Sequence, residues 1–529
     1  MPGKSLPDLS SLEHYKQQAK DLVNAAAQFE PSALDRIRCH YPIRSGPFRL
    51  ADAQRVIARE HGFESWAKFA THIEKLQLAR KVESLGDPVA AFIEAASVSL
   101  HAHSSGTLDE AEMILARYPH VAAGSIHIAA ILADEVTVRA FLARDRLSAT
   151  VKDGPRGWDA LTYLCFSRYL RLDRTRSDVF VLTARALLDA GASANTGWIE
   201  MIDHPNPRPI IESAIYGAAG IAQHAELTRL LLEHGADPND EETPYHVIET
   251  FDNTVLKILL ESGRLNAQSL STLLHRKCDW HDLEGLRAVL EHGVDPNRIT
   301  GWGNAALHQS VRRDNSLKMI ELLLDYGADP ALPNRDGKSA IAIAARRGRA
   351  AALDLFERRG TAILLAGADG LIAACARDHK ATIHSLTAAE PHLKSEVIEQ
   401  GGRLLAEFSG VGNLAGVRNL LDLGVSVTGL FREGDGYFSI AKNSTALHVA
   451  AWRAWPEVVK ELIARGAPVN TIDAQGRTAL QLAVKACVDS YWTERRSPDS
   501  VRMLLEAGAS TEGIEVPTGY DEVDKLFQP

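Results

Sequence analysis

Three residues of this chain have the types that bind transition metals. His275, Cys278 and His281 are spaced three residues apart, and zinc accepts imidazole and thiolate ligands. Residues spaced in this way drift around the surface of a helix, and no fourth ligand is evident beside them. We therefore do not expect a metal ion at these residues.

Four carboxylates are the second candidate set for chemistry. They occur as two pairs far apart in the chain, Glu200 with Asp203 and Glu433 with Asp435. Paired carboxylates act as general acid and base when a fold brings them together. The chain has no Gly-x-Ser-x-Gly, P-loop or His-Glu-x-x-His motif, and no Gly-x-Gly-x-x-Gly motif followed by a suitable acid. We therefore expect no catalytic residue, no metal and no cofactor, and we keep a catalytic pocket as an alternative.

Two repeated phrases indicate which elements position these side chains. The phrase Leu-Leu-x-x-Gly-Ala-x-x-Asn recurs in complete or partial copies that end at Asn195, Asn239, Asn297, Pro330, Asn470 and Ser510. A second phrase alternates with it, around His246, His308, His448 and Gln481. Glycine directly after a leucine-rich segment is typical of a helix that ends at a left-handed residue. The phrases therefore predict pairs of short helices joined by turns.

The spacing between the two phrases is regular. The turn glycine precedes the next motif position by 15 residues at Gly293, Gly327, Gly360 and Gly466. In the other direction, 18 residues separate the motif position from the next glycine at His275, Ala342 and His448. Short helix pairs at one fixed period cannot bury their apolar faces alone, so they stack into a solenoid.

These phrases resemble the two halves of the ankyrin repeat, Thr-Pro-Leu-His-x-Ala and Leu-Leu-x-x-Gly-Ala-x-x-Asn. The resemblance implies an all-α solenoid of about twelve helix-turn-helix units over residues 87–510, with irregular units at its start and near Pro391. It also implies that the motif histidines hydrogen-bond the turns and are structural. Ankyrin arrays of this kind, including bacterial ones, bind other proteins.

Composition and charge exclude several other classes of protein. Of 529 residues, 45% are hydrophobic and 24% are charged, which argues against a disordered chain or a coiled coil. The net charge of −10 disfavours general binding to nucleic acid. Five scattered cysteines suit a reducing compartment, and the sequence has no apolar stretch long enough to span a membrane. We expect a cytoplasmic monomer that does not enter a membrane.

Departures from the regular spacing locate inserted segments. Six extra residues lie between Gly191 and Glu212, and nine lie between Gly424 and His448. Both insertions enlarge a finger, the loop that joins consecutive repeats and that borders the concave face in ankyrin arrays. The helix-to-helix loops at 171–176 and 491–496 are also longer than the register requires.

The fingers carry aromatic and charged residues together, a combination that protein interfaces favour. We predict a partner-binding surface that consists of Trp198, Met201, Asp203, His204, Trp302, Phe431, Arg432, Asp435, Tyr437 and Phe438. Trp302 is included because the register places it at a fingertip, where a polar residue is usual. The alternative for each side chain is that it folds back and closes its own loop.

Residues 1–80 do not follow the repeat and predict a small helical domain. Proline at position 31 and glycine at position 62 separate the expected helices, and residues 48–74 resemble an N-terminal module of bacterial ankyrin-repeat proteins. Gln54, Ala58 and Gly62 also have the spacing of a helix-turn-helix. Residues 511–529 are expected to form a C-terminal tail.

The function predicted from these observations is a non-catalytic scaffold that binds a protein partner through the concave face and the long fingers. Two alternatives remain open. One is a small-molecule or catalytic pocket formed by the long loops, and the other is a nucleic-acid adaptor that uses the N-terminal helices.

Overall fold

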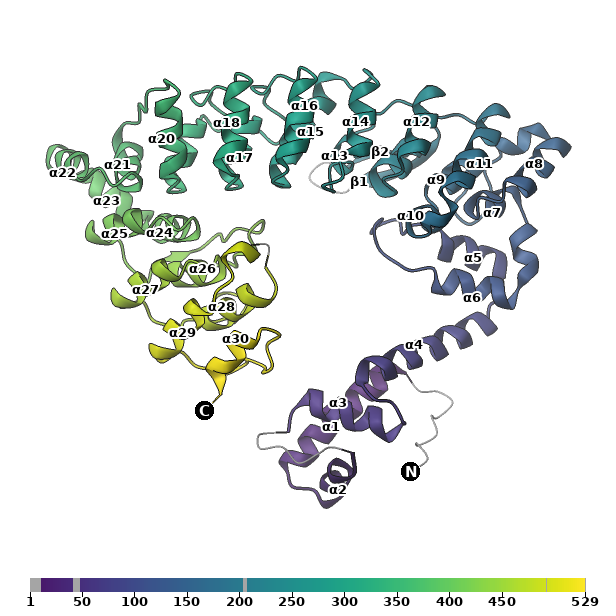
Figure 1. Ribbon diagram of the computed structural model, residues 1–529, viewed down its shortest axis with the longest axis horizontal. Helices are drawn as coiled ribbons and strands as arrows, with labels where there is room; N and C mark the ends of the chain where they lie inside the picture. Colours follow the sequence, from purple (N-terminus) through teal and green to yellow (C-terminus); the bar gives the residue numbers. More distant parts are fainter. Residues whose placement is uncertain (1–10, 41–47, 203–206, 491, 529) are drawn as a thin grey trace. The chain divides into compact units, whose positions relative to one another are not determined.

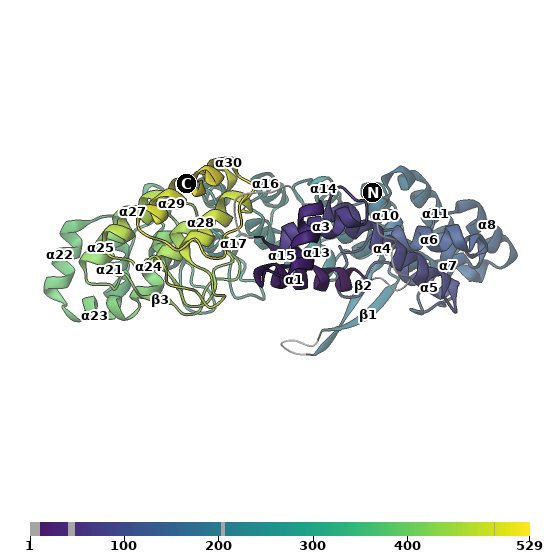
Figure 2. The ribbon, with the colours of Figure 1, turned by 90° about the horizontal axis from the view of Figure 1, so that it is seen from below.

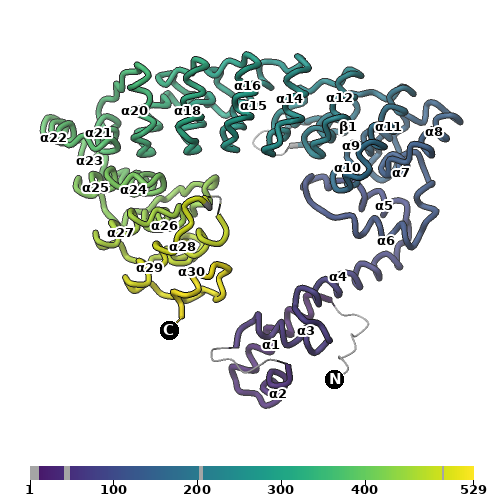
Figure 3. Tube along the Cα trace, viewed as in Figure 1, coloured from purple at the N-terminus to yellow at the C-terminus, as the bar shows by residue number. Residues whose placement is uncertain are grey.

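The protein is a helical solenoid built from short antiparallel helix pairs (Figures 1 and 3). The computed structural model describes residues 11–40, 48–202, 207–490 and 492–528. The chain divides into two compact units, Met1–Val247 (unit 1) and Ile248–Pro529 (unit 2). No helix in the described ranges has the length and apolar character that a membrane crossing requires. The predicted fold class is confirmed, with two small sheets added to the helices.

Unit 1 begins with four helices that surround their own core. These helices are α1 (Leu12–Ala27), α2 (Pro31–His40), α3 (Leu50–Glu60) and α4 (Trp66–Glu83). Tyr15, Ile57 and Phe69 are buried in one apolar cluster, and the ring of Tyr15 meets Phe69 edge to face. Packing therefore accounts for the helical spacing of these apolar residues.

The rest of unit 1 consists of repeat helices and one β-hairpin. The helices are α5 (Pro88–Ala96), α6 (Asp109–Arg117), α7 (Ile126–Ile131), α8 (Glu135–Arg144), α9 (Ala160–Cys165), α10 (Arg168–Leu172), α11 (Ser177–Asp189), α12 (Ala225–Glu233) and α13 (Glu242–His246). A π-helical turn covers Tyr216–Ile221. The hairpin pairs β1 (Gly197–Ile202) with β2 (Arg208–Ser213), and its two strands extend away from the helices (Figure 2).

Unit 2 contains the most regular repeats. Its helices up to the finger are α14 (Thr254–Glu261), α15 (Ala267–Asp279), α16 (Leu283–Glu291), α17 (Ala306–Arg312), α18 (Leu317–Asp325), α19 (Ala340–Arg346), α20 (Ala350–Arg358), α21 (Gly367–Ala376), α22 (Lys380–Ala389), α23 (His392–Glu399), α24 (Gly401–Gly410) and α25 (Leu414–Asp422). After it come β3 (Leu430–Phe431), β4 (Ser444–Thr445), α26 (Ala446–Trp452), α27 (Pro456–Ala464), α28 (Ala479–Val488), α29 (Asp499–Glu506) and α30 (Asp521–Asp524).

The residues of α19 show why these helices are short and closely stacked. Ser339 caps the helix by accepting a hydrogen bond from the backbone N–H of Ala342. Residues 340–345 are all buried, and four of these six residues are alanines, which let α17 and α21 approach on either side. Gly360, which ends the repeat, has φ of +88°, a conformation that a residue with a side chain rarely adopts.

The stacking changes between α21 and α24. An extra helix, α23, lies in this interval, and α22 has no buried residue along its ten positions. By comparison, α18 buries Met319, Ile320, Leu322 and Leu323. The side chains of α22 therefore contribute little to the apolar core of unit 2.

Candidate functional site

The motif histidines hold the turns of the repeats. In His308, Nδ1 accepts a hydrogen bond from the backbone N–H of Ala305, which leaves Nε2 to donate to the carbonyl of Leu332 at 2.9 Å. His448 forms the same pair of bonds with the N–H of Thr445 and the carbonyl of Thr471. Desolvation lowers the pKa of both imidazoles, so they are neutral at pH 7.

His275, Cys278 and His281 do not form a metal site among the described residues. His275 is buried, and its ring stacks on Trp302 at 4.9 Å between centroids. The thiol of Cys278 faces the carbonyls of Leu274 and Ala306. His281 lies at a left-handed turn, so the three side chains have separate environments.

The long finger of unit 2, residues 429–443 (finger 2), folds back onto helices α15, α17 and α19. The hydroxyl of Tyr437 donates to the carbonyl of Asp279 at 2.5 Å and accepts a hydrogen bond from Nε2 of His281 at 3.0 Å. The guanidinium of Arg313 lies 3.7 Å from the centre of the Tyr437 ring. Finger 2 is therefore attached to a repeat that lies more than four repeats earlier in the chain.

Phe438 anchors finger 2 next to a buried ionic network. Its side chain is 4% exposed, and the guanidinium groups of Arg347 and Arg453 lie 5.3 and 4.1 Å from its ring centre. Both arginines donate to Asp314, and Arg347 also pairs with Glu407 at 2.8 Å. Burial alone would raise the pKa of Asp314, but the two arginines outweigh burial and lower this pKa.

The two insertions of the C-terminal repeats also pack against each other. Phe438 shares an apolar cluster with Trp452 and with Trp492 from the long helix-to-helix loop. The indole of Trp452 donates to the carbonyl of Phe438, and the indole of Trp492 donates to the carbonyl of Trp452. These aromatic residues close the long loops of unit 2.

A cavity of about 800 Å³ lies between finger 2, the first helices of the repeats and helix α24. Its basic lining residues are Arg312, Arg313, Lys338, Arg346, Arg347, Arg403 and Arg432. Its acidic lining residues are Asp336, Glu399, Glu407, Glu433 and Asp435. Most of the wall is polar, so the cavity suits a charged ligand better than an apolar one.

The arginines of the cavity differ in whether they are paired. Arg313 pairs with Asp279 at 2.6 Å, and Arg346 pairs with Asp369 at 2.6 Å. Arg312 and Arg432 are exposed, and neither side chain forms an ion pair or hydrogen bond within the described ranges. Desolvation by the surrounding chain, followed by repulsion from Arg313 and Arg347, lowers the pKa of Arg312. The cavity therefore contains positive charge that an anion would stabilise.

The long finger of unit 1 is the hairpin of β1 and β2. Trp198 is half-buried on its inner face and stacks on Trp158 at 5.4 Å between ring centroids. Met201 lies on the opposite face and is 56% exposed, with Ile199 and Ile211 beside it on the same face. Asp203 and His204 of the predicted surface lie outside the described residues.

The structure therefore brings together only some of the predicted partner-binding residues. Phe431, Arg432 and Asp435 line the cavity of unit 2, although Phe431 is buried on Ala406 and Val449. Tyr437 and Phe438 lie in the same finger and hold it in place. Trp302 is 49% exposed, as the register suggested, but it covers His275 and does not line the cavity.

Sequence reasoning missed the arginines of the cavity. The pairs Arg312–Arg313 and Arg346–Arg347 occupy equivalent places at the ends of α17 and α19, 34 residues apart. A pair of adjacent arginines that recurs at the repeat period, at the end of the first helix, is a signal that the sequence does contain.

Sequence reasoning also missed Glu212. It occupies the place of a motif histidine at the end of an insertion, and the structure buries it next to Glu200 and His103. A carboxylate in a motif position was the available signal.

Comparison with known proteins agrees with the repeat architecture. Residues 289–344 match the family model of ankyrin repeats in many copies, and residues 404–513 match the model of ankyrin repeats in three copies. The ankyrin repeat domain of human ASB11 is similar at 23% identity, with 45% of this chain and 98% of that chain covered and a TM-score of 0.21.

Similar segments also occur in curated proteins. Notch-regulated ankyrin repeat-containing protein B of Danio rerio is 54% identical over 46 residues, which are 9% of this chain and 40% of that protein. BCL-6 corepressor-like protein 1 of Homo sapiens is 41% identical over 75 residues, 14% of this chain and 4% of that protein. The chain thus spans less than half the length of these relatives. The repeats, their register and these matches make this chain an ankyrin-repeat protein.

Proposed function

We propose that this protein is a cytoplasmic, monomeric and non-catalytic scaffold, and that the cavity of unit 2 binds an acidic segment of a protein partner. The observation that carries the proposal is Arg312. Its guanidinium is exposed at the cavity wall without an ionic partner in the described part of the chain, while Arg313 and Arg347 beside it are already paired.

The electrostatics of the wall favour an anionic partner. The two neighbouring arginines make an additional positive charge at Arg312 unfavourable, and a carboxylate from a partner would relieve that repulsion. A guanidinium presents two parallel N–H donors to a carboxylate, which adds geometric selectivity to the charge attraction. A side chain of aspartate or glutamate fits this chemistry.

The position of Arg432 strengthens the argument. It is exposed on finger 2 and lines the same cavity, with no ion pair or hydrogen bond of its side chain in the described ranges. Finger 2 is fixed by Tyr437 and Phe438, so Arg432 is presented on an anchored loop. An anchored binding loop loses less conformational entropy when the partner binds.

The outer face of the hairpin in unit 1 is a second surface that we propose for partner contact. Ile199, Met201 and Ile211 are exposed side by side on this face, whereas Ile210 is buried on the other. Adjacent exposed apolar side chains on an extended hairpin are typical of an interaction surface.

Charge reversal at the cavity tests the proposal. Partners captured from the source cells by the intact chain would be titrated against wild type and the double variant Arg312→Glu, Arg432→Glu. We expect the double variant to weaken binding at least about tenfold, and wild-type binding to weaken as salt is raised. Arg287→Glu is the matched control, because Arg287 is exposed on α16 and does not line the cavity. Equal affinity of the double variant and wild type, with unchanged circular dichroism, would remove the cavity from the interface.

A further inference from the structure

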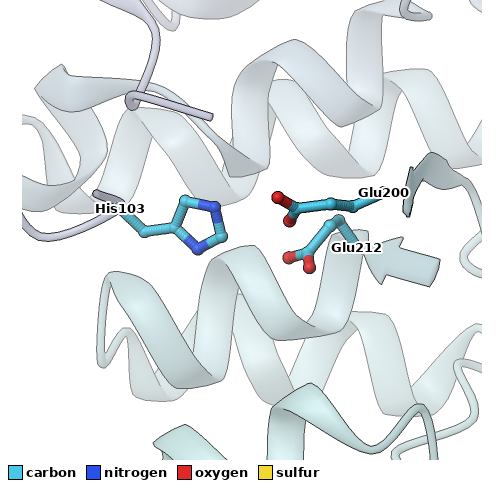
Figure 4. A group of neighbouring side chains, drawn as sticks. All are labelled: His103, Glu200 and Glu212. Carbon is cyan, nitrogen blue, oxygen red and sulfur yellow. The ribbon is translucent and has the colours of Figure 1, made fainter. Parts of the chain in front are cut away.

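A group of three possible metal ligands lies in unit 1, on the inner face of the hairpin. His103, Glu200 and Glu212 each offer one ligand atom, and these atoms lie within 4.8 Å of one another. His103 belongs to the loop between α5 and α6, whereas Glu200 and Glu212 lie on β1 and β2. Figure 4 shows the imidazole on one side and the two carboxylates opposite it.

Glu212 is the member of the group that most needs a partner. Its side chain is 1% exposed, and its Oε2 atom has no hydrogen-bond partner. Glu212 pairs with Trp198 across the hairpin, and Trp198 stacks on Trp158. A carboxylate oxygen that is buried without a donor costs free energy unless a proton or a cation compensates it.

The surroundings supply no such cation from the chain. Glu200 lies 3.6 Å from His101, and neither Glu200 nor Glu212 forms an ion pair with lysine or arginine in the described ranges. Glu242 adds a further carboxylate nearby and lies 3.2 Å from His246. Burial, followed by repulsion from Glu242 and Glu200, raises the pKa of Glu212 to about 9. Negative charge thus accumulates at this point of the fold.

The imidazole of His103 is already oriented by the fold. One ring nitrogen lies 2.6 Å from the hydroxyl of Tyr216, and the other lies 3.1 Å from the carbonyl of Leu100. A histidine that binds a metal typically keeps one such hydrogen bond on the nitrogen that does not coordinate. His103 can therefore exchange one of these two contacts for an ion and keep the other.

We propose that His103, Glu200 and Glu212 bind one divalent transition-metal ion of the zinc type. Bonds from zinc to nitrogen or oxygen are about 2.0–2.2 Å, so ligand atoms of one ion lie at most about 4.4 Å apart. Small rotations of the two glutamate side chains close the remaining difference. One imidazole and two carboxylates suit zinc or manganese, whereas magnesium and calcium prefer ligands that are all oxygen. The ion links the hairpin to the loop of His103.

Zinc titration of the intact, chelator-treated protein tests this inference. Isothermal titration calorimetry of wild type is expected to show one saturable zinc site, and Glu212→Gln and His103→Gln are each expected to weaken it at least about tenfold. Cobalt added in place of zinc should give visible absorption in wild type that both variants lose. Glu241→Gln is the matched control, because Glu241 pairs with Arg208 outside the group and should leave binding unchanged.

Two results would overturn the inference. The first is the absence of a saturable zinc site in wild type, which would mean that a proton alone compensates Glu212. The second is zinc binding of equal affinity in wild type, Glu212→Gln and His103→Gln, which would place the site elsewhere. Glu200→Gln provides a second carboxylate variant if either substitution disturbs the circular dichroism spectrum, since Glu200 is only partly buried.

Discussion

Single residues of finger 2 show that an aromatic side chain in a long loop can serve the fold and not the partner. Phe431 and Phe438 are almost fully buried, and Tyr437 uses its hydroxyl to hold α15. Arg432, between them, stays exposed at the cavity. The aromatic residues therefore fix the finger, and the charged residue is left for recognition.

Removing the ring of Phe438 should destabilise unit 2 strongly. Phe438→Ala is expected to lower the free energy of unfolding by about 3–5 kcal/mol, because it leaves a cavity beside Arg347 and Arg453. Tyr437→Phe, which removes only the hydroxyl, should cost about 1 kcal/mol. Urea unfolding followed by circular dichroism measures both. A loss below about 1 kcal/mol for Phe438→Ala would show that this ring is not an anchor.

Acid should destabilise the repeats through His275. Burial lowers the pKa of this imidazole to about 4, below the ordinary value of about 6.5 in an unfolded chain. Between these values the unfolded state binds more protons, so stability is complete above pH 6.5 and falls as the pH drops toward 4. His275→Gln should make urea midpoints depend less on pH in this window. An unchanged pH profile in the variant would contradict the assignment.

Among the elements, the regular helices were predictable and the fingers were not. The motif positions Ala342 and His448 lie in the first helices α19 and α26, and Gly360 adopts the expected left-handed conformation. The local sequence contains these signals, because each repeat encodes its own cap, packing face and turn.

The path of the fingers depends on residues far away in the chain. Spacing locates the extra residues after Gly191 and Gly424, but it does not specify that the first insertion pairs as a hairpin. It also does not specify that Tyr437 binds the backbone of Asp279, 158 residues earlier. Such contacts form only after the repeats have stacked, so no local pattern predicts them.

The two faces of β2 should differ in their effect on stability. Ile210 is buried on the inner face of the hairpin and Ile211 is exposed on the outer face. Ile210→Ala is expected to cost about 2–5 kcal/mol in unfolding free energy, and Ile211→Ala under about 0.5 kcal/mol. Similar costs for the two substitutions, measured by urea unfolding, would contradict the register of this hairpin.

The segment around α22 should open before the neighbouring repeats. Its helix buries no side chain, so local unfolding there breaks few apolar contacts. Native-state hydrogen exchange is expected to show early exchange over residues 380–389 and slow exchange over α18, which serves as the internal reference. Equal protection of the two helices would refute this prediction.

On the scale of the whole molecule, unit 2 departs from the usual rule that each repeat contacts only its neighbours. Tyr437 binds Asp279, and Arg453 binds Asp314 across 139 residues. These contacts join the repeats before α21 to those after α23, across the segment in which α22 is weakly packed. Unit 2 should therefore unfold as one cooperative body.

Replacing finger 2 should separate the two halves of unit 2. A variant with residues 432–441 replaced by a glycine–serine linker of equal length keeps every repeat helix but loses Tyr437 and Phe438. Hydrogen exchange under increasing urea is expected to give one opening free energy for α15 and α26 in wild type and two different values in the variant. Two different values already in wild type would show that finger 2 does not couple the repeats.

The contact between Tyr437 and Asp279 also has a kinetic consequence. During synthesis, helix α15 leaves the ribosome 158 residues before its partner tyrosine exists. Until then the hydroxyl contact is missing, and the buried network around Asp314 lacks Arg453. Arrays with only local contacts fold quickly, whereas contacts between distant residues slow folding. The last step in folding of unit 2 is therefore the docking of finger 2, and the cationic cavity exists only after that step.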